Sequence, residues 1–238
     1  MRFLAGLVAF AAVLLPSAAV AQAVDPAAPG GVAPASPTDP QNLLLLDLST
    51  GGRVTIWLRP DVAPKMVERV KTLTRQHFYD GLTFHRVIDG FMAQGGDPKG
   101  DGTGGSPLPN VPAEFNNLPH VRGAVSAARA EDKDSANSQF FIVFQPKLAL
   151  DRKYTVFGRV IDGMQYVDAI ERGEPPASPS RIVHAYVAAD NPPAYQPLPP
   201  AAALPATPAL LPTGPAVAAP KPAPAKRAPA PRKAARSR

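Results

Sequence analysis

With 238 residues, 45% of them hydrophobic, the chain is long enough to bury one sizeable core or two small ones. Its net charge of +6 comes from the segment after residue 190, which holds seven Lys and Arg residues and no acid. Since the rest of the chain is slightly acidic, the basicity gives no reason to expect a nucleic-acid groove on the folded part. The absence of cysteine excludes both disulfides and a lipid-modified cysteine.

The first 23 residues have the pattern of a cleavable secretory signal peptide. Arg2 precedes an apolar run over residues 3–15, and two A-x-A cleavage signals end at Ala21 and Ala23. The alternative is an uncleaved membrane anchor, but the apolar run is shorter than the about 20 residues that a span needs. In a bacterium, this segment predicts secretion to the periplasm.

Residues 24–40 are rich in Pro, Ala and Gly and show no periodicity, which is typical of a linker. We expect the folded domain to occupy residues 41–190. At its start, two strand-like runs flank Thr50-Gly51-Gly52, which predicts a β-hairpin. A helix is then expected from Pro64 on, because apolar residues recur at spacings of three and four on a single face. These residues are Met66, Val67, Val70 and Leu73.

Short β-rich runs make up most of the domain after this helix. In chain order they are LTFHRVI, FMAQG, GAVSAA, QFFIVF and YTVFGRVI, and RIVHAYVAA is expected as the last strand. Before that last strand, residues 163–170 predict a second short helix, which Gly173 and the Pro175-Pro176 pair would end. About eight strands and two helices without βαβ alternation favour an antiparallel barrel or sandwich with helices over its ends.

The segment over residues 191–238 is predicted to be a disordered basic tail. It holds 14 of the 31 prolines and is otherwise mostly alanine with scattered Lys and Arg. Its cations could bind anionic envelope surfaces or acidic partners weakly and with strong salt dependence. Alternatively, the tail is a solvated extension without a partner, and the sequence leaves both interpretations open.

Four segments together resemble the cyclophilin-type peptidyl-prolyl cis-trans isomerases. They are FHRVIDGFMAQGGD at 84–97, DGTGG at 101–105, SQFFI at 138–142 and LDRKYTVFGRVIDGM at 150–164. They occur in the family's order, and the resemblance covers residues 42–189. It implies a mainly β domain built as a closed eight-stranded antiparallel barrel capped by two α-helices, with both ends of the chain outside it.

An enzyme of this kind needs no nucleophile, metal or cofactor, because no covalent bond breaks. Amide resonance sets a rotation barrier of about 18–20 kcal/mol, so uncatalysed X-Pro isomerisation takes on the order of tens to hundreds of seconds. The enzyme must instead fit the twisted amide better than either planar form. As the bond twists, the lone pair of the proline nitrogen becomes available, so a fixed donor beside it stabilises only the transition state.

By resemblance, Arg86 is the catalytic donor, since its planar and permanently charged guanidinium offers several N–H groups. The ordinary alternative for a strand arginine is a half-exposed surface ion pair. Alternation places Arg86 on a largely apolar strand face. That face is shared by Leu82, Phe84 and Ile88.

The resemblance assigns the proline pocket to a set of apolar residues. They are Phe91, Met92, Phe141 and Leu150. Gln94 is expected to hydrogen-bond the backbone of the bound peptide. Ala128 and Arg129 are expected to present backbone groups to it, which makes their side chains less decisive. Gln139 is expected to support the pocket rather than to touch substrate.

Two positions depart from the pattern of many eukaryotic members. Ala149 stands where they carry a tryptophan, and Tyr154 stands where they carry a pocket histidine. A phenol can still stack and donate a hydrogen bond, so Tyr154 remains an expected substrate contact. Loss of the indole should weaken the binding of cyclosporin-like macrocycles.

The sequence lacks the residue spacing that a metal site or a serine hydrolase would need. The loop from Asp97 begins like a calcium site, but Lys99 stands at a ligand position and Leu108 at the expected glutamate. The four histidines are far apart in the sequence, and no G-x-S-x-G motif occurs. We therefore expect no metal, no cofactor and no specific nucleic-acid partner, and a chain that acts as a monomer.

Three functional interpretations remain open. In the first, the protein isomerises X-Pro bonds in proline-containing peptides and unfolded secreted proteins, and so assists their folding. In the second, it is a chaperone module that binds proline peptides with little turnover. In the third, the basic tail is the main actor and tethers the domain to an anionic surface or an acidic partner.

Overall fold

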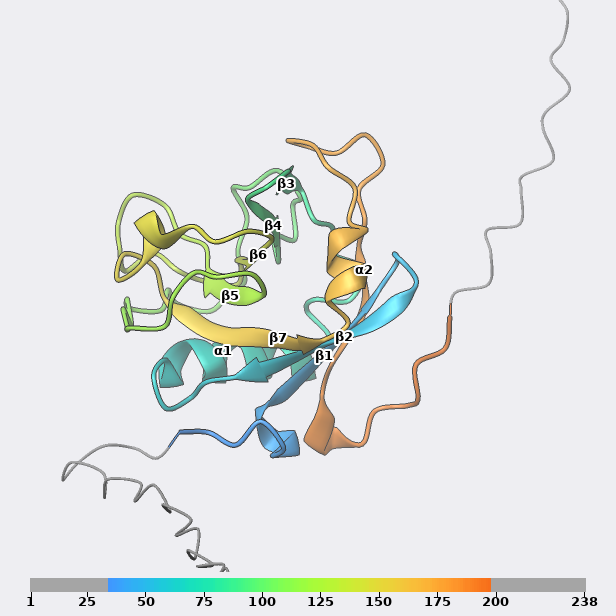
Figure 1. The fold of residues 1–238 in the computed structure, drawn as a ribbon, viewed down its shortest axis with the longest axis horizontal. Helices are drawn as coiled ribbons and strands as arrows, with labels where there is room; N and C mark the ends of the chain where they lie inside the picture. The colour runs from blue at the N-terminus through green and yellow to red at the C-terminus, as the bar shows by residue number, and fades with distance from the viewer. Residues whose placement is uncertain (1–33, 198–238) are drawn as a thin grey trace, which may run out of the picture. The chain divides into compact units, whose positions relative to one another are not determined.

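Eight antiparallel strands form one curled sheet in the computed structural model of the chain, which describes residues 34–197 (Figure 1). Their spatial order is β3-β4-β6-β5-β7-β2-β1-β8. The strands are β1 (Leu43–Leu48), β2 (Gly52–Leu58), β3 (Arg86–Ile88), β4 (Met92–Gly95), β5 (Ala124–Ala127), β6 (Phe140–Val143), β7 (Val156–Asp162) and β8 (Ile182–Val187). The helices are α1 (Pro64–Arg75) and α2 (Met164–Asp168). The predicted mainly β fold with two α-helices is confirmed.

The β1–β2 hairpin shows how alternation in the sequence becomes a core face. Along β2 every second residue is buried, and Val54, Ile56 and Leu58 are among them. The turn passes through Gly51 with a φ of +99°, a conformation that glycine adopts without steric cost. The predicted hairpin is therefore present, and its inward face joins the main hydrophobic core.

Helix α1 buries the four apolar residues that its periodicity predicted. Ala63 at its N-cap offers no side-chain hydrogen bond. The carboxylate of Glu114 takes that role from a distant loop, accepting the N–H groups of Lys65 and Met66 at 3.0 and 2.9 Å. A carboxylate there also interacts favourably with the helix dipole. The loop after β4 thus fixes where the helix begins.

The expectation of a closed barrel is wrong, because within residues 34–197 the two edge strands β3 and β8 form no ladder with each other. A single bridge, Thr83 to Arg181, joins the residues ahead of them. Opposite β3 lies Gly173, whose N–H and carbonyl bond to Val87 at 2.9 and 2.8 Å. The chain between Gly173 and β8 contains three prolines, which have no N–H for a ladder. The sheet is therefore a half-barrel whose open edge is covered by this loop.

Most of the predicted terminal segments lie outside the described residues. The predicted signal peptide (residues 1–23), residues 24–33 of the linker and residues 198–238 of the tail are among them. The described chain ends beside β1 and β8, where Tyr195 lines a cavity of about 300 Å³ together with Asp47 and His184. Within residues 34–197, no helix has the length and apolar character needed to cross a membrane.

The start of α2 gives a test of backbone strain. Gly163 has a φ of +82°, and a Cβ there would lie 2.3 Å from the carbonyl oxygen of Arg53. Gly51 also has a positive φ, but a Cβ there would meet nothing within 4 Å. Each Gly→Ala change should cost about 1–2 kcal/mol for the left-handed backbone, and Gly163→Ala should lose at least about 1 kcal/mol more through overlap with β2.

Urea unfolding of both variants, followed by the fluorescence of the single tryptophan, measures this difference. Equal losses of unfolding free energy would contradict the close approach of α2 to β2.

Candidate active site

A row of side chains crosses β3, β4 and β6 on one face of the sheet. Arg86 pairs with Gln94, and Gln94 pairs with Phe141. Residues directly opposite each other on neighbouring strands project to the same face. Met92 lies two residues before Gln94 and so shares that face. The register thus places a guanidinium, an amide, a thioether and a phenyl ring side by side.

Beside this row lies a small apolar cluster that is separate from the main core. Its buried members include Met92 and Phe141, and its half-exposed rim includes Phe91, Leu150 and Tyr154, with Ala128 alongside. The Phe141 ring centroid lies 6.4 Å from that of Phe91 and 6.0 Å from that of Tyr154. The structure thus brings the four predicted pocket residues together. A buried floor with a half-exposed aromatic rim suits a small apolar ring.

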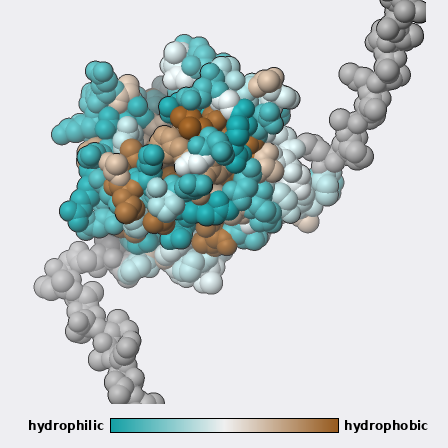
Figure 2. Space-filling view, turned by 45° about the horizontal axis from the view of Figure 1, so that its top comes forward, coloured by the Kyte–Doolittle hydropathy of each residue, from teal (hydrophilic) through white to brown (hydrophobic). Residues whose placement is uncertain are grey.

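The exposed apolar surface of the folded part is divided into separate patches. Figure 2 shows one face of the folded part with apolar patches separated by hydrophilic side chains. Among the described residues, the large hydrophobic side chains that are exposed are Phe115, Leu148 and Ile161. Leu148 belongs to the 3₁₀ turn Leu148–Leu150, which also carries Leu150 of the cluster.

Arg86 lies at the edge of a cavity of about 580 Å³ that Gln94, Arg129 and Glu174 also line. Its side chain is 43% exposed, and its Nε donates to Glu174 Oε2 at 2.7 Å. The guanidinium is therefore both a half-exposed ion-pair partner, as expected of an ordinary strand arginine, and a wall of the cavity beside the apolar cluster. Glu174 is 88 residues away in the sequence, and no local pattern pointed to it.

Two glutamines connect this cavity to the loop after β4. Gln94 Nε2 donates to Gln139 Oε1 at 2.9 Å. The Gln139 amide in turn donates to the carbonyls of Gly102 and Gly104 at 3.0 and 2.7 Å. Gln139 therefore holds the loop and orients Gln94, which agrees with a supporting role.

Ala128 can contribute a backbone group to the site, whereas Arg129 contributes its side chain. The N–H of Ala128 donates to the Gln139 carbonyl at 3.0 Å, so of its two backbone groups only the carbonyl can serve a bound peptide. The Arg129 guanidinium lies over the Tyr154 ring, 4.6 Å from its centroid, and its Nη2 donates to the Lys153 carbonyl at 3.2 Å. The Arg129 side chain thus fixes an aromatic wall of the cluster, a role that the sequence did not predict.

His120 is a second residue that the sequence analysis missed. It is fully buried, and its ring stacks on Phe141 with centroids 6.1 Å apart. Its Nδ1 lies 2.9 Å from Asp151 Oδ1 and its Nε2 lies 3.2 Å from Ser126 Oγ. Hydrogen bonds from the backbone N–H and the ring of His120 hold the pKa of Asp151 below its usual range. His120 therefore forms a hydrogen-bonded floor under the apolar cluster.

His85 precedes Arg86, is buried, and lines a cavity together with Gly100 and Gly102 of the loop after β4. Burial lowers the pKa of its imidazole. It lines the same cavity as Arg86, although strand alternation predicts opposite faces. The reason is that Phe84 and His85 precede β3 and are not part of a regular strand, so side chains need not alternate there. Both residues are buried. Across residues 34–197, no group of three His, Asp or Glu side chains is arranged to hold a metal ion.

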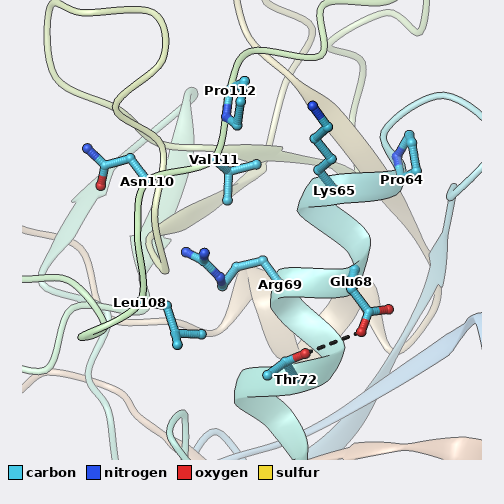
Figure 3. Close-up of a pocket in the computed structure, with 9 residues that line it drawn as sticks. All are labelled: Pro64, Lys65, Glu68, Arg69, Thr72, Leu108, Asn110, Val111 and Pro112. Atoms are coloured by element: carbon cyan, nitrogen blue, oxygen red, sulfur yellow. Dashed lines mark hydrogen bonds between the residues drawn. The ribbon is translucent and has the colours of Figure 1, made fainter.

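A further cavity of about 530 Å³ lies between α1 and the segment over residues 108–112, and it contains none of the predicted site residues. Figure 3 shows Arg69 reaching from α1 toward that segment, next to Glu68, which pairs with Thr72 on the same helix. The Arg69 Nη2 donates to the Pro109 carbonyl at 2.5 Å. Its lining includes Pro64, Leu108, Val111 and Pro112 beside Arg69, but it shares no residue with the cavity that Arg86 lines.

Comparison with known proteins agrees with this geometry. A family model described as "Cyclophilin type peptidyl-prolyl cis-trans isomerase/CLD" matches residues 45–187. A "Probable peptidyl-prolyl cis-trans isomerase" of Brucella suis is 46% identical over 177 residues, which cover 68% of this chain and 90% of that protein. "Peptidyl-prolyl cis-trans isomerase B" of Bacillus subtilis is 43% identical over 129 residues, covering 53% of this chain and 89% of that protein.

Two solved structures have the same fold. Cyclophilin AquaCyp293 from Hirschia baltica is 30% identical with a TM-score of 0.59, covering 64% of this chain and 76% of its own. A cyclophilin-type isomerase of Cryptosporidium parvum, solved in the presence of the dipeptide Ala-Pro, is 28% identical with a TM-score of 0.57, covering 61% of this chain and 98% of its own. The chain therefore belongs to the cyclophilin-type family, and it is a peptidyl-prolyl cis-trans isomerase.

Proposed function

We propose that this isomerase accelerates rotation about X-Pro bonds by non-covalent stabilisation of the twisted amide, with Arg86 as the donor to the proline nitrogen. The observation that carries the proposal is the row Arg86–Gln94–Phe141, which sets a guanidinium next to an apolar cluster. In this arrangement the cluster takes the proline ring, and the amide that rotates lies under the guanidinium.

The remaining site residues hold the peptide on either side of the rotating bond. Gln94 and Ala128 line a cavity of about 200 Å³, and Ala128 also packs against the cluster. The Gln94 amide and the Ala128 carbonyl would bind backbone groups of the peptide. Fixing one side while the other turns converts binding energy into a lower barrier. The Ala-Pro dipeptide named with the Cryptosporidium structure supports proline-containing peptides as ligands.

A chaperone module that binds proline peptides with little turnover is the second candidate. The observation that favours it is the Arg86–Glu174 ion pair, which occupies the Nε donor of the guanidinium. The first proposal stands against it because a guanidinium has five N–H groups and this contact uses one. The effect of removing Arg86 on turnover separates the two candidates.

We further propose that the protein acts on unfolded secreted proteins in the periplasm. The signal-peptide pattern at the start of the chain supports this location. The seven cations after residue 190 would add a weak, salt-sensitive attraction to anionic envelope surfaces.

Replacing Arg86 with Ala should lower kcat/KM for an X-Pro peptide about 100-fold, because a preorganised charged donor is lost. Arg75 is a matched control: its side chain is 44% exposed and its Nε lies 2.9 Å from Asp190, but it lies on α1. Arg75→Ala should leave turnover unchanged. A protease-coupled peptide assay measures both, and equal turnover in the wild type and Arg86→Ala would contradict the mechanism.

The site should resist cyclosporin, because Ala149 leaves the 3₁₀ turn Leu148–Leu150 without an indole. We expect an inhibition constant weaker than about 1 µM. Ala149→Trp should tighten inhibition by about tenfold or more, since a buried indole is a typical hot spot. Nanomolar inhibition of the wild type, measured in the same assay, would show that the indole is not the determinant.

Processing of the signal peptide should leave Gln22 or Val24 as the mature N-terminus. Ala21 belongs to both A-x-A signals, so Ala21→Lys should block cleavage at either site, because small residues are needed there. Intact-mass analysis of the periplasmic fraction of an expressing Gram-negative host measures this. Recovery of the uncleaved wild type in the membrane fraction would favour the anchor interpretation instead.

A further inference from the structure

The contact between Arg86 and Glu174 is made at one particular atom of the guanidinium. Nε donates to Glu174 Oε2 at 2.7 Å. Nη1 and Nη2 of Arg86 donate no hydrogen bond to any of the described residues. Since the guanidinium is planar, a fixed Nε–H direction also fixes the plane in which both Nη groups lie. The carboxylate therefore leaves four N–H donors in a defined orientation.

Glu174 is carried by a backbone that is itself anchored to β3. The preceding residue, Gly173, exchanges two backbone hydrogen bonds with Val87, at 2.8 and 2.9 Å. Gly173 has a φ of +146°, and a Cβ there would lie 2.6 Å from the Cα of Pro176, which is buried. The tight turn thus requires glycine at this position, and it places Glu174 next to the strand residue that it contacts.

Arg172 anchors the other side of the same segment. Its Nε donates to Asp89 just beyond β3 at 3.3 Å, and its Nη1 donates to the Asp168 carbonyl at 2.7 Å. Its guanidinium also lies over the Phe144 ring, 4.2 Å from the centroid. Residues 172–174 thus follow β3 with three successive contacts, so the backbone at Glu174 is held beside Arg86 before substrate arrives.

The ion pair is poorly suited to stabilising the fold. The two side chains are 43% and 51% exposed, and ion pairs at such sites contribute little to stability. A flexible arginine, however, loses conformational freedom when it donates to the twisted amide in the transition state, and an anchor that restricts it in advance reduces that loss. The contact is therefore better explained by orientation of Arg86 than by stability.

We propose that Glu174 is a positioning residue for the isomerase reaction: it holds Nε of Arg86 so that the two Nη groups are presented to the proline nitrogen of the substrate. This inference rests on the proposed role of Arg86. It adds that the loop before β8, through one carboxylate, sets the orientation of the donor and hence the rate of the chemical step.

Glu174→Ala and Glu174→Gln test the proposal, and Glu171→Ala is a matched control with the same charge change at an exposed position on the same loop. Glu174→Ala should lower kcat about tenfold with KM within about twofold, because orientation of the donor acts on the transition state. Glu174→Gln should stay within about threefold of the wild type, since the amide oxygen still accepts from Nε. Glu171→Ala should not change turnover.

A second readout reports on the contact itself. The Nε–H resonance of Arg86 in a ¹⁵N-edited NMR spectrum should shift in Glu174→Ala and return toward its original position in Glu174→Gln. In addition, Glu174→Ala should have no further effect in an Arg86→Ala background, because a residue that acts through Arg86 has nothing left to orient. Unchanged urea midpoints show that the variants are folded.

The donor role of Arg86 and the positioning role of Glu174 fail in different ways. If Arg86→Ala abolishes turnover but Glu174→Ala leaves kcat unchanged or raises it, Glu174 is a bystander or a competitor of substrate, and only the positioning role is overturned. If Arg86→Ala leaves turnover unchanged, both roles are overturned. A loss of kcat in Glu174→Gln as large as that in Glu174→Ala would also contradict positioning through Nε.

Discussion

The pairing register of β3 with β4 is the constraint on which the rest of the site depends. Because side chains alternate along a strand, a slip of one residue would turn Arg86 to the opposite face and bring Val87 to the cavity. The same register joins Gln94 to Phe141 on β6, so the slip would also separate the guanidinium from the apolar cluster. A single alignment of backbone hydrogen bonds thus decides whether the polar and apolar parts of the site meet.

This register is held from both sides of a very short strand. β3 has three residues and lies at the edge of the sheet, which would ordinarily leave its outer backbone groups unpaired. The bonds between Val87 and Gly173 satisfy that edge, and Arg172 and Glu174 add side-chain contacts on either side of it. The loop that lies along β3 in place of a barrel-closing ladder is therefore also the loop that contacts Arg86. One segment thus both leaves the sheet open and contributes a residue to the site.

Local patterns in the sequence predicted the elements well and the long-range contacts poorly. Helix α1 was predicted from its apolar residues at spacings of three and four, because a dozen residues are enough to show helical periodicity. These residues are Met66, Val67, Val70 and Leu73. The site residues, Arg86 included, came from the family resemblance, since an arginine on a strand looks like an ordinary ion-pair partner and apolar residues on strands look like ordinary core. Alternation failed at Phe84 and His85, which lie just outside β3 and are both buried. No spacing rule applies there, because the backbone is not a regular strand.

The contacts that sequence analysis missed share a physical property. His120 meets Asp151 across 31 residues, and Arg86 meets Glu174 across 88. Such pairs depend on how separate loops pack, and a single sequence carries no local signature of that packing. Gly173 and the prolines after it predicted that the second helix stops before them, although α2 ends earlier than expected, at Asp168. Their effect on the sheet could not be predicted, because it requires knowing that this loop lies opposite β3.

Under the proposed mechanism, the two parts of the site contribute differently to rate. The apolar cluster around Phe141 contacts a proline ring whose surface is the same in the cis, trans and twisted forms, so it strengthens binding of all three. Uniform binding lowers KM without raising kcat. Acceleration must then come from the donor, whose interaction grows only as the amide twists. Since one guanidinium provides that difference, its orientation has more influence on the rate than further apolar contact would have.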